Sequence, residues 1–256
     1  ASPRNKGNLL GDVVAQKEEA LVQAYPFWNS MVCPPKLARL QLDPLDPDLI
    51  ADKADYVISA LDGDLAYDLE PSLRERGVGV FSNASSSRWD PTIPLLIPEV
   101  NPEDIAMLTS QGGGVQICNP NCTTAGYTPL IKALEDLGYT LSTVNLVTQQ
   151  SISGKGDAIA EGEYVKRLLG NVADDWTNEG HNGEEWKSAY EPQRILGRVR
   201  SLEDLEIEIE KVRKGEPSKI LPIWSQTTRV ATQYGHLEHL TLTFSEPVDI
   251  DNVRDD

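Results

Sequence analysis

The residue best suited to chemistry in this sequence is Cys122. It follows a short apolar run at 115–118 and the turn Asn119-Pro120-Asn121, and it precedes a helical pattern of apolar residues, Leu130, Ile131, Leu134 and Leu137. The amides at a helix N-terminus carry partial positive charge, which stabilises a thiolate and can receive an oxyanion formed on an attacked carbonyl. We therefore predict that Cys122 is a thiol nucleophile at the start of a helix. The alternative, a buried structural cysteine, is the commoner fate of a lone cysteine.

A thiol nucleophile also needs a general base, and the chain has three histidines, His181, His236 and His239. His236 follows Gly235 between two strand patterns, where a side chain can reach a cleft; the alternative is an exposed histidine in a turn. His236 and His239 could instead be metal ligands. However, Gly-His-Leu-Glu-His lacks the helical His-Glu-x-x-His spacing and a third ligand, so we expect no metal.

A glycine-rich turn follows the strand pattern that ends near Gln150. Residues 150–156 read Gln-Ser-Ile-Ser-Gly-Lys-Gly. Glycines in such a turn let the backbone approach a ligand closely, although one short turn is weak support for a binding site.

The elements that must position these residues begin with alternating strands and helices. Buried-strand patterns at 56–61, 78–82 and 115–118 flank a helical pattern at 64–76, which Pro71 interrupts or bounds and Gly77 ends. This β-α-β order predicts a parallel sheet, and ligands bind at the carboxyl ends of such strands. The proline-rich connection at 83–102 has the length of a functional loop.

The second half of the chain has a different pattern. Longer strands are predicted at 141–150, 220–233 and 237–244, and helices near 161–169 and 183–191. Gly138 is the expected end of the helix that starts at Cys122, and Ser201-Leu-Glu-Asp resembles a capping box that opens an acidic helix. These elements predict an α+β domain with a mostly antiparallel sheet.

Composition limits the partners. The chain has 256 residues, 39% of them hydrophobic, and a formal net charge of -17 without a Lys/Arg cluster, which argues against nucleic acid. Three cysteines without metal-ligand spacing indicate thiols in a reducing compartment, which predicts a cytoplasmic protein. Because no apolar run reaches membrane-spanning length and the opening residues are not a signal peptide, we expect no membrane association.

Several segments, in this order, resemble the aspartate-β-semialdehyde dehydrogenase family in its archaeal and fungal branch. Each segment alone is weak, but the ordered set covers nearly the whole chain, and its Arg and His lie seven residues apart. The segments are Ala1-Ser2-Pro3-Arg4, Ser59-Ala60-Leu61, Ser82-Asn83-Ala84 with Arg88, Pro98-Glu99-Val100-Asn101, Asn119-Pro120-Asn121-Cys122, Gln150 with Ser153-Gly154, Glu184-Glu185-Trp186-Lys187, and Arg229 with Gly235-His236.

The resemblance implies an NADP-dependent interconversion of aspartyl phosphate and aspartate semialdehyde. Cys122 would form a thioacyl enzyme, with His236 as general acid/base and Gln150 orienting the thioester. Arg229 would bind the substrate carboxylate and Glu184 the substrate amine. The phosphate would be bound by Arg88, Lys187 and Asn121.

The resemblance also implies the cofactor contacts and the domains. The fold would be α/β: an incomplete Rossmann-type NADP domain at 1–120, an α+β catalytic and dimerisation domain at 121–245, and the start of a return to the first domain at 246–256. The protein would form a homo-oligomer. The implied cofactor residues are Ser2, Arg4, Ser59, Ala60, Leu61, Ser153 and Gly154.

Two departures from the family leave alternatives open. The sequence opens after the family's first strand and Gly-x-x-Gly-x-x-Gly loop, so we expect a chain truncated at both ends that binds NADP poorly. Lys155 stands where the family has a small residue, and 157–181 differs from its pattern. The alternatives are a paralogue acting on another semialdehyde or acyl phosphate, and an inactive remnant serving as a dimerisation module. The N-acetylglutamyl-phosphate reductase family is further away, because its cysteine region differs.

Overall fold

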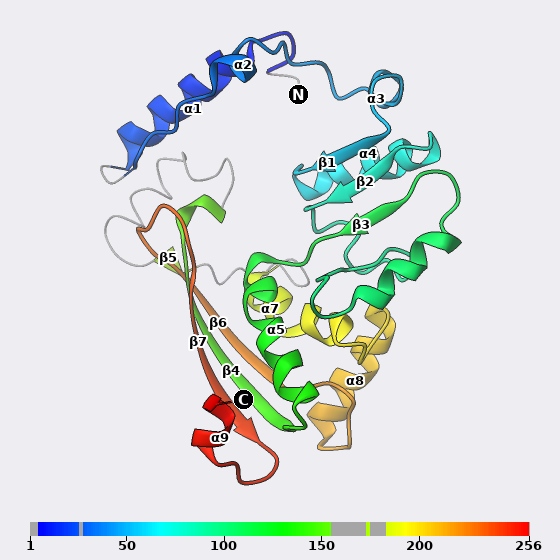
Figure 1. Ribbon diagram of the computed structural model, residues 1–256, viewed down its shortest axis with the longest axis vertical. Helices are drawn as coiled ribbons and strands as arrows, with labels where there is room; N and C mark the ends of the chain where they lie inside the picture. The colour runs from blue at the N-terminus through cyan, green and yellow to red at the C-terminus, as the bar shows by residue number, and fades with distance from the viewer. Residues whose placement is uncertain (1–4, 26–27, 155–172, 175–182, 256) are drawn as a thin grey trace. The chain divides into compact units, whose positions relative to one another are not determined.

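The computed structural model describes residues 5–25, 28–154, 173–174 and 183–255 (Figure 1). The chain divides into two compact units, the first made of 1–50, 149–175 and 228–237 and the second of 51–148, 176–227 and 238–256. Ser2, Arg4, Lys155 and the helix predicted near 161–169 lie outside the described residues.

A three-stranded parallel sheet lies in the second unit. Its strands are β1 (Tyr56–Ser59), β2 (Gly79–Ser82) and β3 (Gln116–Cys118), in that order. Helix α4 (Gly63–Glu75) joins β1 to β2, and the 3-10 helix η1 (Pro102–Ser110) lies in the connection to β3. The predicted β-α-β order is confirmed, and the sheet is Rossmann-like.

Pro71 lies inside helix α4 rather than at its boundary. The helix ends where Gly77 adopts a φ of 83°, a left-handed conformation that favours glycine. Inside the helix, Glu70 is fully buried and accepts hydrogen bonds from Ser82 Oγ at 2.7 Å and Gln116 Nε2 at 2.9 Å. These bonds tie α4 to the carboxyl end of β2 and to the start of β3.

The second sheet has the order β5-β6-β4-β7. Its strands are β4 (Leu141–Gln150), β5 (Ala173–Asp174), β6 (Ile223–Arg229) and β7 (Leu237–Phe244). The expected mostly antiparallel sheet is in fact mixed. Strand β5 pairs antiparallel with β6. Val144 N donates to Pro222 O, and Val230 N donates to Gln150 O, so β4 and β6 run in the same direction.

Strand β6 is shorter than the predicted strand at 220–233. Pro222 precedes the strand and has no N–H to donate to a β-ladder. After the strand, Thr232 N donates to Val230 O, so the chain leaves the extended conformation there. The predicted bounds of β4 are confirmed at 141–150.

Helix α5 (Cys122–Asp136) packs its apolar side on this sheet. Tyr127, Ile131 and Leu134 contact a core that includes Leu141, Val144, Leu146 and Leu221. After the helix, Gly138 has a φ of 90°, so the predicted helix end is confirmed.

Three more helices belong to the second unit: α7 (Glu184–Ile195), α8 (Leu202–Lys214) and α9 (Ile250–Asp255). The predicted cap of α8 is confirmed, because Ser201 Oγ accepts from Asp204 N at 3.2 Å. The Asp204 carboxylate reaches back to Arg200 N at 3.3 Å, one residue earlier than in a standard capping box.

The first unit contains helices to which sequence reasoning assigned no element: α1 (Leu10–Ala24), α2 (Pro35–Ala38) and most of α3 (Pro47–Ala51). Its small core joins Leu21 and Tyr25 to Ile152, with Trp28 packed beside them. Gln233 forms two hydrogen bonds with the backbone of Asn29. This unit therefore packs the turn that follows β4 against the N-terminal helix. Among the described residues, no helix is long and apolar enough to cross a membrane.

Candidate active site

Cys122 is the first residue of helix α5 and is exposed to solvent. Strand β3 ends at Cys118, and the turn 119–121 carries the chain from the strand into the helix. The predicted strand-turn-helix position is therefore confirmed, while the nucleophilic role stays a prediction. Buried Cys118 differs sharply from Cys122, because burial is the main cause that raises the pKa of its thiol to about 12.

Asn121 caps the helix and is held from three directions. Its Oδ1 accepts from Thr123 N at 3.0 Å, which satisfies one of the unpaired amides of the first turn. Its Nδ2 donates to Glu184 Oε2 at 2.8 Å, and its backbone N donates to Glu191 Oε2 at 2.6 Å. The orientation of the residue before Cys122 thus depends on two carboxylates of helix α7.

Arg88 is buried, with 6% of its surface exposed, and is already paired within the second unit. Its Nη1 donates to Glu191 Oε1 at 2.9 Å, and its Nη2 donates to Asn83 O at 2.9 Å. Its Nε is buried without a hydrogen-bond partner among the described residues. The predicted phosphate contact therefore stays a prediction, and binding of an anion there would have to rearrange this pair.

Arg194 holds the backbone of the same loop. Its guanidinium donates to the carbonyl oxygens of Arg88, Asp90 and Ile93. Burial is the main cause that lowers its pKa. Sequence reasoning missed Glu191 and Arg194. Their spacing of seven and ten residues from Glu184 places all three near one face of the helix, which is the signal that could have found them.

Lys187 completes the group in the second unit. Its Nζ lies 3.2 Å from Glu184 Oε1, and both side chains are largely buried. Four predicted substrate residues, Arg88, Asn121, Glu184 and Lys187, are therefore brought together by helix α7, and Asn121 directly precedes Cys122. Arg88 pairs with Glu191, and Lys187 pairs with Glu184. The two cations and two carboxylates of this cluster therefore balance one another in charge.

A second group of predicted residues lies in the first unit, around the turn after β4. Ser151 N donates to His236 Nδ1 at 3.1 Å, so Nδ1 is an acceptor and the neutral ring carries its proton on Nε2. Ser151 Oγ lies 3.3 Å from the same nitrogen and 3.0 Å from Ser153 Oγ. Ser151, which sequence reasoning did not select, therefore sets the tautomer of the predicted acid/base.

Gly154 lies where Arg229 and His236 converge. A Cβ on Gly154 would lie 3.0 Å from Arg229 Nη1 and 3.7 Å from His236 Cε1, so a side chain there would crowd both. Arg229 is almost completely buried and donates from Nη1 to Ser151 O at 2.6 Å. Gln150 is fully buried at the end of β4. The structure thus brings together Gln150, Ser153, Gly154, Arg229 and His236 around one turn.

The predicted cofactor residues Ser59, Ala60 and Leu61 lie at the carboxyl end of β1. Ser59 pairs with Ser82 of β2, and Ser82 pairs with Cys118 of β3, so the three strands end at one edge. The Ser59 hydroxyl is buried without a hydrogen-bond partner among the described residues. An unpaired buried hydroxyl at this edge fits a polar ligand, because parallel sheets bind ligands there.

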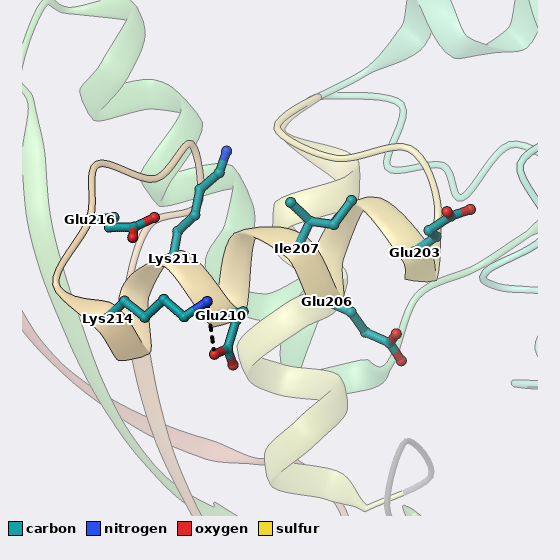
Figure 2. A pocket seen from close by; sticks show the side chains of 7 residues that line it. All are labelled: Glu203, Glu206, Ile207, Glu210, Lys211, Lys214 and Glu216. Atoms are coloured by element: carbon teal, nitrogen blue, oxygen red, sulfur yellow. Dashed lines mark ion pairs between the residues drawn. The ribbon is translucent and has the colours of Figure 1, made fainter.

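A concave surface along helix α8 contains none of the predicted residues (Figure 2). Lys214 pairs with Glu210 at 3.4 Å within this surface. Its lining residues are Glu203, Glu206, Ile207, Glu210, Lys211, Lys214 and Glu216. In the part of the chain that the structure describes, no group of three or more His, Cys, Asp and Glu side chains is arranged to hold a metal ion.

Comparisons with known proteins agree with this architecture. Residues 12–108 match the family described as semialdehyde dehydrogenase, NAD binding domain. The chain is 32% identical over 232 residues to the aspartate-semialdehyde dehydrogenase of Archaeoglobus fulgidus, covering 86% of this chain and 59% of that protein. It is 30% identical over 261 residues to the aspartate-semialdehyde dehydrogenase of Methanothermobacter thermautotrophicus, covering 100% of this chain and 65% of that protein.

The solved structure of aspartate semialdehyde dehydrogenase with NADP from Candida albicans is also similar. It has a TM-score of 0.72 at 27% identity, over 100% of this chain and 66% of that one. The chain thus spans less than two thirds of the length of both curated relatives described above.

Proposed function

Because this chain belongs to the aspartate-semialdehyde dehydrogenase family, we propose that the protein interconverts aspartyl phosphate and aspartate semialdehyde with NADP, through a thioester on Cys122. The observation that carries the proposal is the exposed Cys122 thiol at the first residue of α5, beside an Asn121 cap held by Glu184 and Glu191. That arrangement favours a thiolate, and the first turn of a helix is a place where backbone amides can receive an oxyanion.

In the reductive direction, the Cys122 thiolate attacks the acyl carbon of aspartyl phosphate. A carbon–sulfur bond forms, the carbon–oxygen bond to phosphate breaks, and inorganic phosphate leaves. When bound, NADP supplies or accepts the hydride at the thioester carbon. Hydride addition would leave an oxyanion on the thioester carbon, and its collapse breaks the carbon–sulfur bond and releases the aldehyde and the thiolate. The proton that the reduction consumes overall passes from a general acid to the departing phosphate.

His236 is the proposed general acid/base for these proton transfers. Because Nδ1 accepts from Ser151 N, the Nε2 proton is the one that the neutral ring can donate. Gln150, at the end of β4, is the proposed partner that orients the thioester carbonyl.

The substrate's charged groups match the remaining residues. We assign its carboxylate to Arg229, whose planar guanidinium suits bidentate contact, and its amine to Glu184. Its phosphate would be held by Lys187, Asn121 and Arg88. Glu191 competes for Arg88, so phosphate binding there requires a partner exchange.

The proposed NADP site is the carboxyl edge of the parallel sheet, with Ser59, Ala60 and Leu61, together with Ser153 and Gly154. The buried Ser59 hydroxyl, which has no hydrogen-bond partner among the described residues, is the observation that supports this assignment. Ser2 and Arg4 are assigned to the same cofactor by the sequence resemblance alone.

The remaining proposals concern assembly and location. We propose a nucleotide domain at 1–120, a catalytic and dimerisation domain at 121–245 and a returning segment at 246–256. A homo-oligomer is supported by exposed Trp224 and Val147 on strands β6 and β4. A reducing, cytoplasmic location suits an enzyme that works through a thiol.

Two measurements on the protein test the proposed function. The first is phosphate-dependent reduction of NADP with aspartate semialdehyde, which Cys122→Ser should abolish. The second is intact mass after mixing with aspartyl phosphate, which should show one acyl adduct on the native protein and none on Cys122→Ser. Turnover that survives Cys122→Ser, or an adduct on another residue, would contradict the proposal.

A further inference from the structure

One buried carboxylate connects the two features on which the chemistry depends. Glu191 lies on helix α7 with 1% of its surface exposed. Its Oε1 accepts from Arg88 Nη1 at 2.9 Å, and its Oε2 accepts from the backbone N of Asn121 at 2.6 Å. The same side chain therefore contacts the proposed phosphate arginine and the residue immediately before the proposed nucleophile.

Sharing one carboxylate couples the two partners. A buried charge that loses its partner is strongly unfavourable, so neither Arg88 nor the Asn121 turn can move away without leaving Glu191 partly unpaired. Arg194 strengthens this coupling, because it binds the carbonyl oxygen of Arg88 itself. Arg88, from the loop after β2, pairs with Glu191, and Tyr127 of α5 interacts with it electrostatically. Glu184, Lys187 and Arg194 are the other charged residues of helix α7 in the same group, and Glu184 shares Asn121 with Glu191.

We propose that Glu191 is a positioning residue that fixes the first turn of α5 through Asn121 and offsets the charge of Arg88, and that the thiol of Cys122, the residue after Asn121, responds to both. This inference rests on the proposed function, in which Cys122 is the nucleophile. Glu191 thereby limits the fraction of Cys122 that is thiolate in the resting protein. When a bound anion replaces Glu191 as the partner of Arg88, the electrostatic field that acts on the thiol changes.

The two halves of the ion pair give variants with opposite expected effects. Glu191→Gln keeps the side-chain size and an oxygen that can accept from Asn121 N, but it removes the negative charge and leaves the Arg88 cation without its carboxylate. The thiolate is then favoured. Arg88→Gln leaves the Glu191 carboxylate without its cation, and the thiolate is then disfavoured.

The measurement is the rate of alkylation of Cys122 by iodoacetamide between pH 5 and 9, followed by mass spectrometry that distinguishes Cys122 from Cys118 and Cys33. Below the midpoint of the profile, a tenfold change in rate corresponds to about one unit along the pH axis. Glu191→Gln should speed alkylation at pH 6 by about three- to tenfold, and Arg88→Gln should slow it by a similar factor. The double variant, Glu191→Gln with Arg88→Gln, should be alkylated at nearly the native rate. Of the single variants at Glu191, Glu191→Asp keeps the charge, so its alkylation rate should be closer to native than that of Glu191→Gln.

Glu208→Gln is the matched control. Glu208 is also a buried carboxylate of the second unit, but it binds Lys211, Ser218 and Lys219 on and after helix α8. Its loss should lower stability and leave the alkylation profile at the native position. If circular dichroism shows that Glu191→Gln is unfolded, the slower alkylation expected of Arg88→Gln becomes the test.

An unchanged profile in Glu191→Gln and Arg88→Gln, or shifts of both in the same direction, would overturn the inference. Alkylation needs neither NADP nor substrate, so this result is separate from the proposed function. If Cys122→Ser abolishes turnover while the profiles are unchanged, only the role of Glu191 fails. If the profiles shift as expected and native protein shows neither turnover nor an acyl adduct, the proposed function fails instead.

Discussion

Gly126 lies one helical turn after Cys122 on α5, against the carboxylate of Glu238 on β7. A Cβ on Gly126 would lie 2.7 Å from both carboxylate oxygens of Glu238. Burial raises the pKa of Glu238 to about 7. The missing side chain at 126 thus makes room for a half-buried carboxylate beside the first turns of helix α5.

Gly126→Ala should reveal this contact. Alanine in place of glycine inside a helix usually stabilises it by about 1 kcal/mol, but here the new methyl group must displace the Glu238 carboxylate. We expect Gly126→Ala to leave the free energy of unfolding in urea unchanged in the native protein. In a Glu238→Ala background, the same substitution should give most of the gain. A full gain in the native background would show that the carboxylate moves aside without cost.

Glu238 also predicts a dependence of stability on pH. Because its folded pKa of about 7 lies above its ordinary value of 4.5, the charged form is disfavoured in the folded state, and the native protein loses stability as pH rises from 4.5 to 7. Glu238→Gln should therefore be more stable than native protein at pH 8 by about 1–2 kcal/mol, a figure reduced for its partial exposure, and nearly equal at pH 4. Equal stability at both pH values would contradict the assigned cause.

At the scale of elements, helix α7 organises the predicted substrate residues of the second unit. Glu184, Lys187, Glu191 and Arg194 recur at intervals of three or four residues, which is the spacing of one helix face. Through them the helix holds Asn121, which caps α5, and Arg88, which lies in the loop after β2. One helix thus sets the relation between a loop and the N-terminus of another helix.

Two N-caps in the second unit allow stability and reactivity to be separated. Asn121 caps α5 and Ser201 caps α8, each accepting from the amide of its own first turn. Asn121→Ala and Ser201→Ala should each cost about 1 kcal/mol in unfolding free energy. Only Asn121→Ala should slow Cys122 alkylation at pH 6, by about threefold, because the helix terminus that favours the thiolate frays. Equal alkylation in the two variants would argue against a role for the cap in reactivity.

For the whole molecule, charge is the dominant physical feature. A net charge of -17 repels anions at long range, whereas the substrate in the proposed reaction carries carboxylate and phosphate groups. Arg88, Lys187 and Arg229 supply positive charge, but the first two are paired with Glu191 and Glu184. Long-range repulsion and local attraction therefore act in opposite directions on an anionic ligand.

Two alkylating reagents of nearly equal size can show whether long-range repulsion or local attraction dominates at Cys122. Iodoacetate is anionic and iodoacetamide is neutral, and both react with the Cys122 thiolate. At low ionic strength we expect iodoacetate to react more slowly, and raising the salt to about 0.15 M should narrow the gap, because the Debye length falls to about 8 Å. A faster reaction with iodoacetate at low salt would show that local positive charge outweighs the field of the whole protein.

The sequence by itself determined the features that depend on neighbouring residues. The strand-turn-helix position of Cys122, the β-α-β order of the parallel sheet and the cap at Ser201 follow from periodicity, turn residues and short-range hydrogen bonds. The helix end at Gly138 follows in the same way, because a left-handed φ there favours glycine.

Only the tertiary structure decided which residues meet over long separations. Arg88 and Glu191 are 103 residues apart and Asn121 and Glu191 are 70 apart, so no local pattern could pair them. Likewise β4 lies between β6 and β7, although those two strands are consecutive in the described chain. Such choices depend on how buried charges and apolar faces find partners together. For that reason Cys122 and its helix could be predicted from the sequence, and the pairing of Glu191 with Asn121 and Arg88 could not.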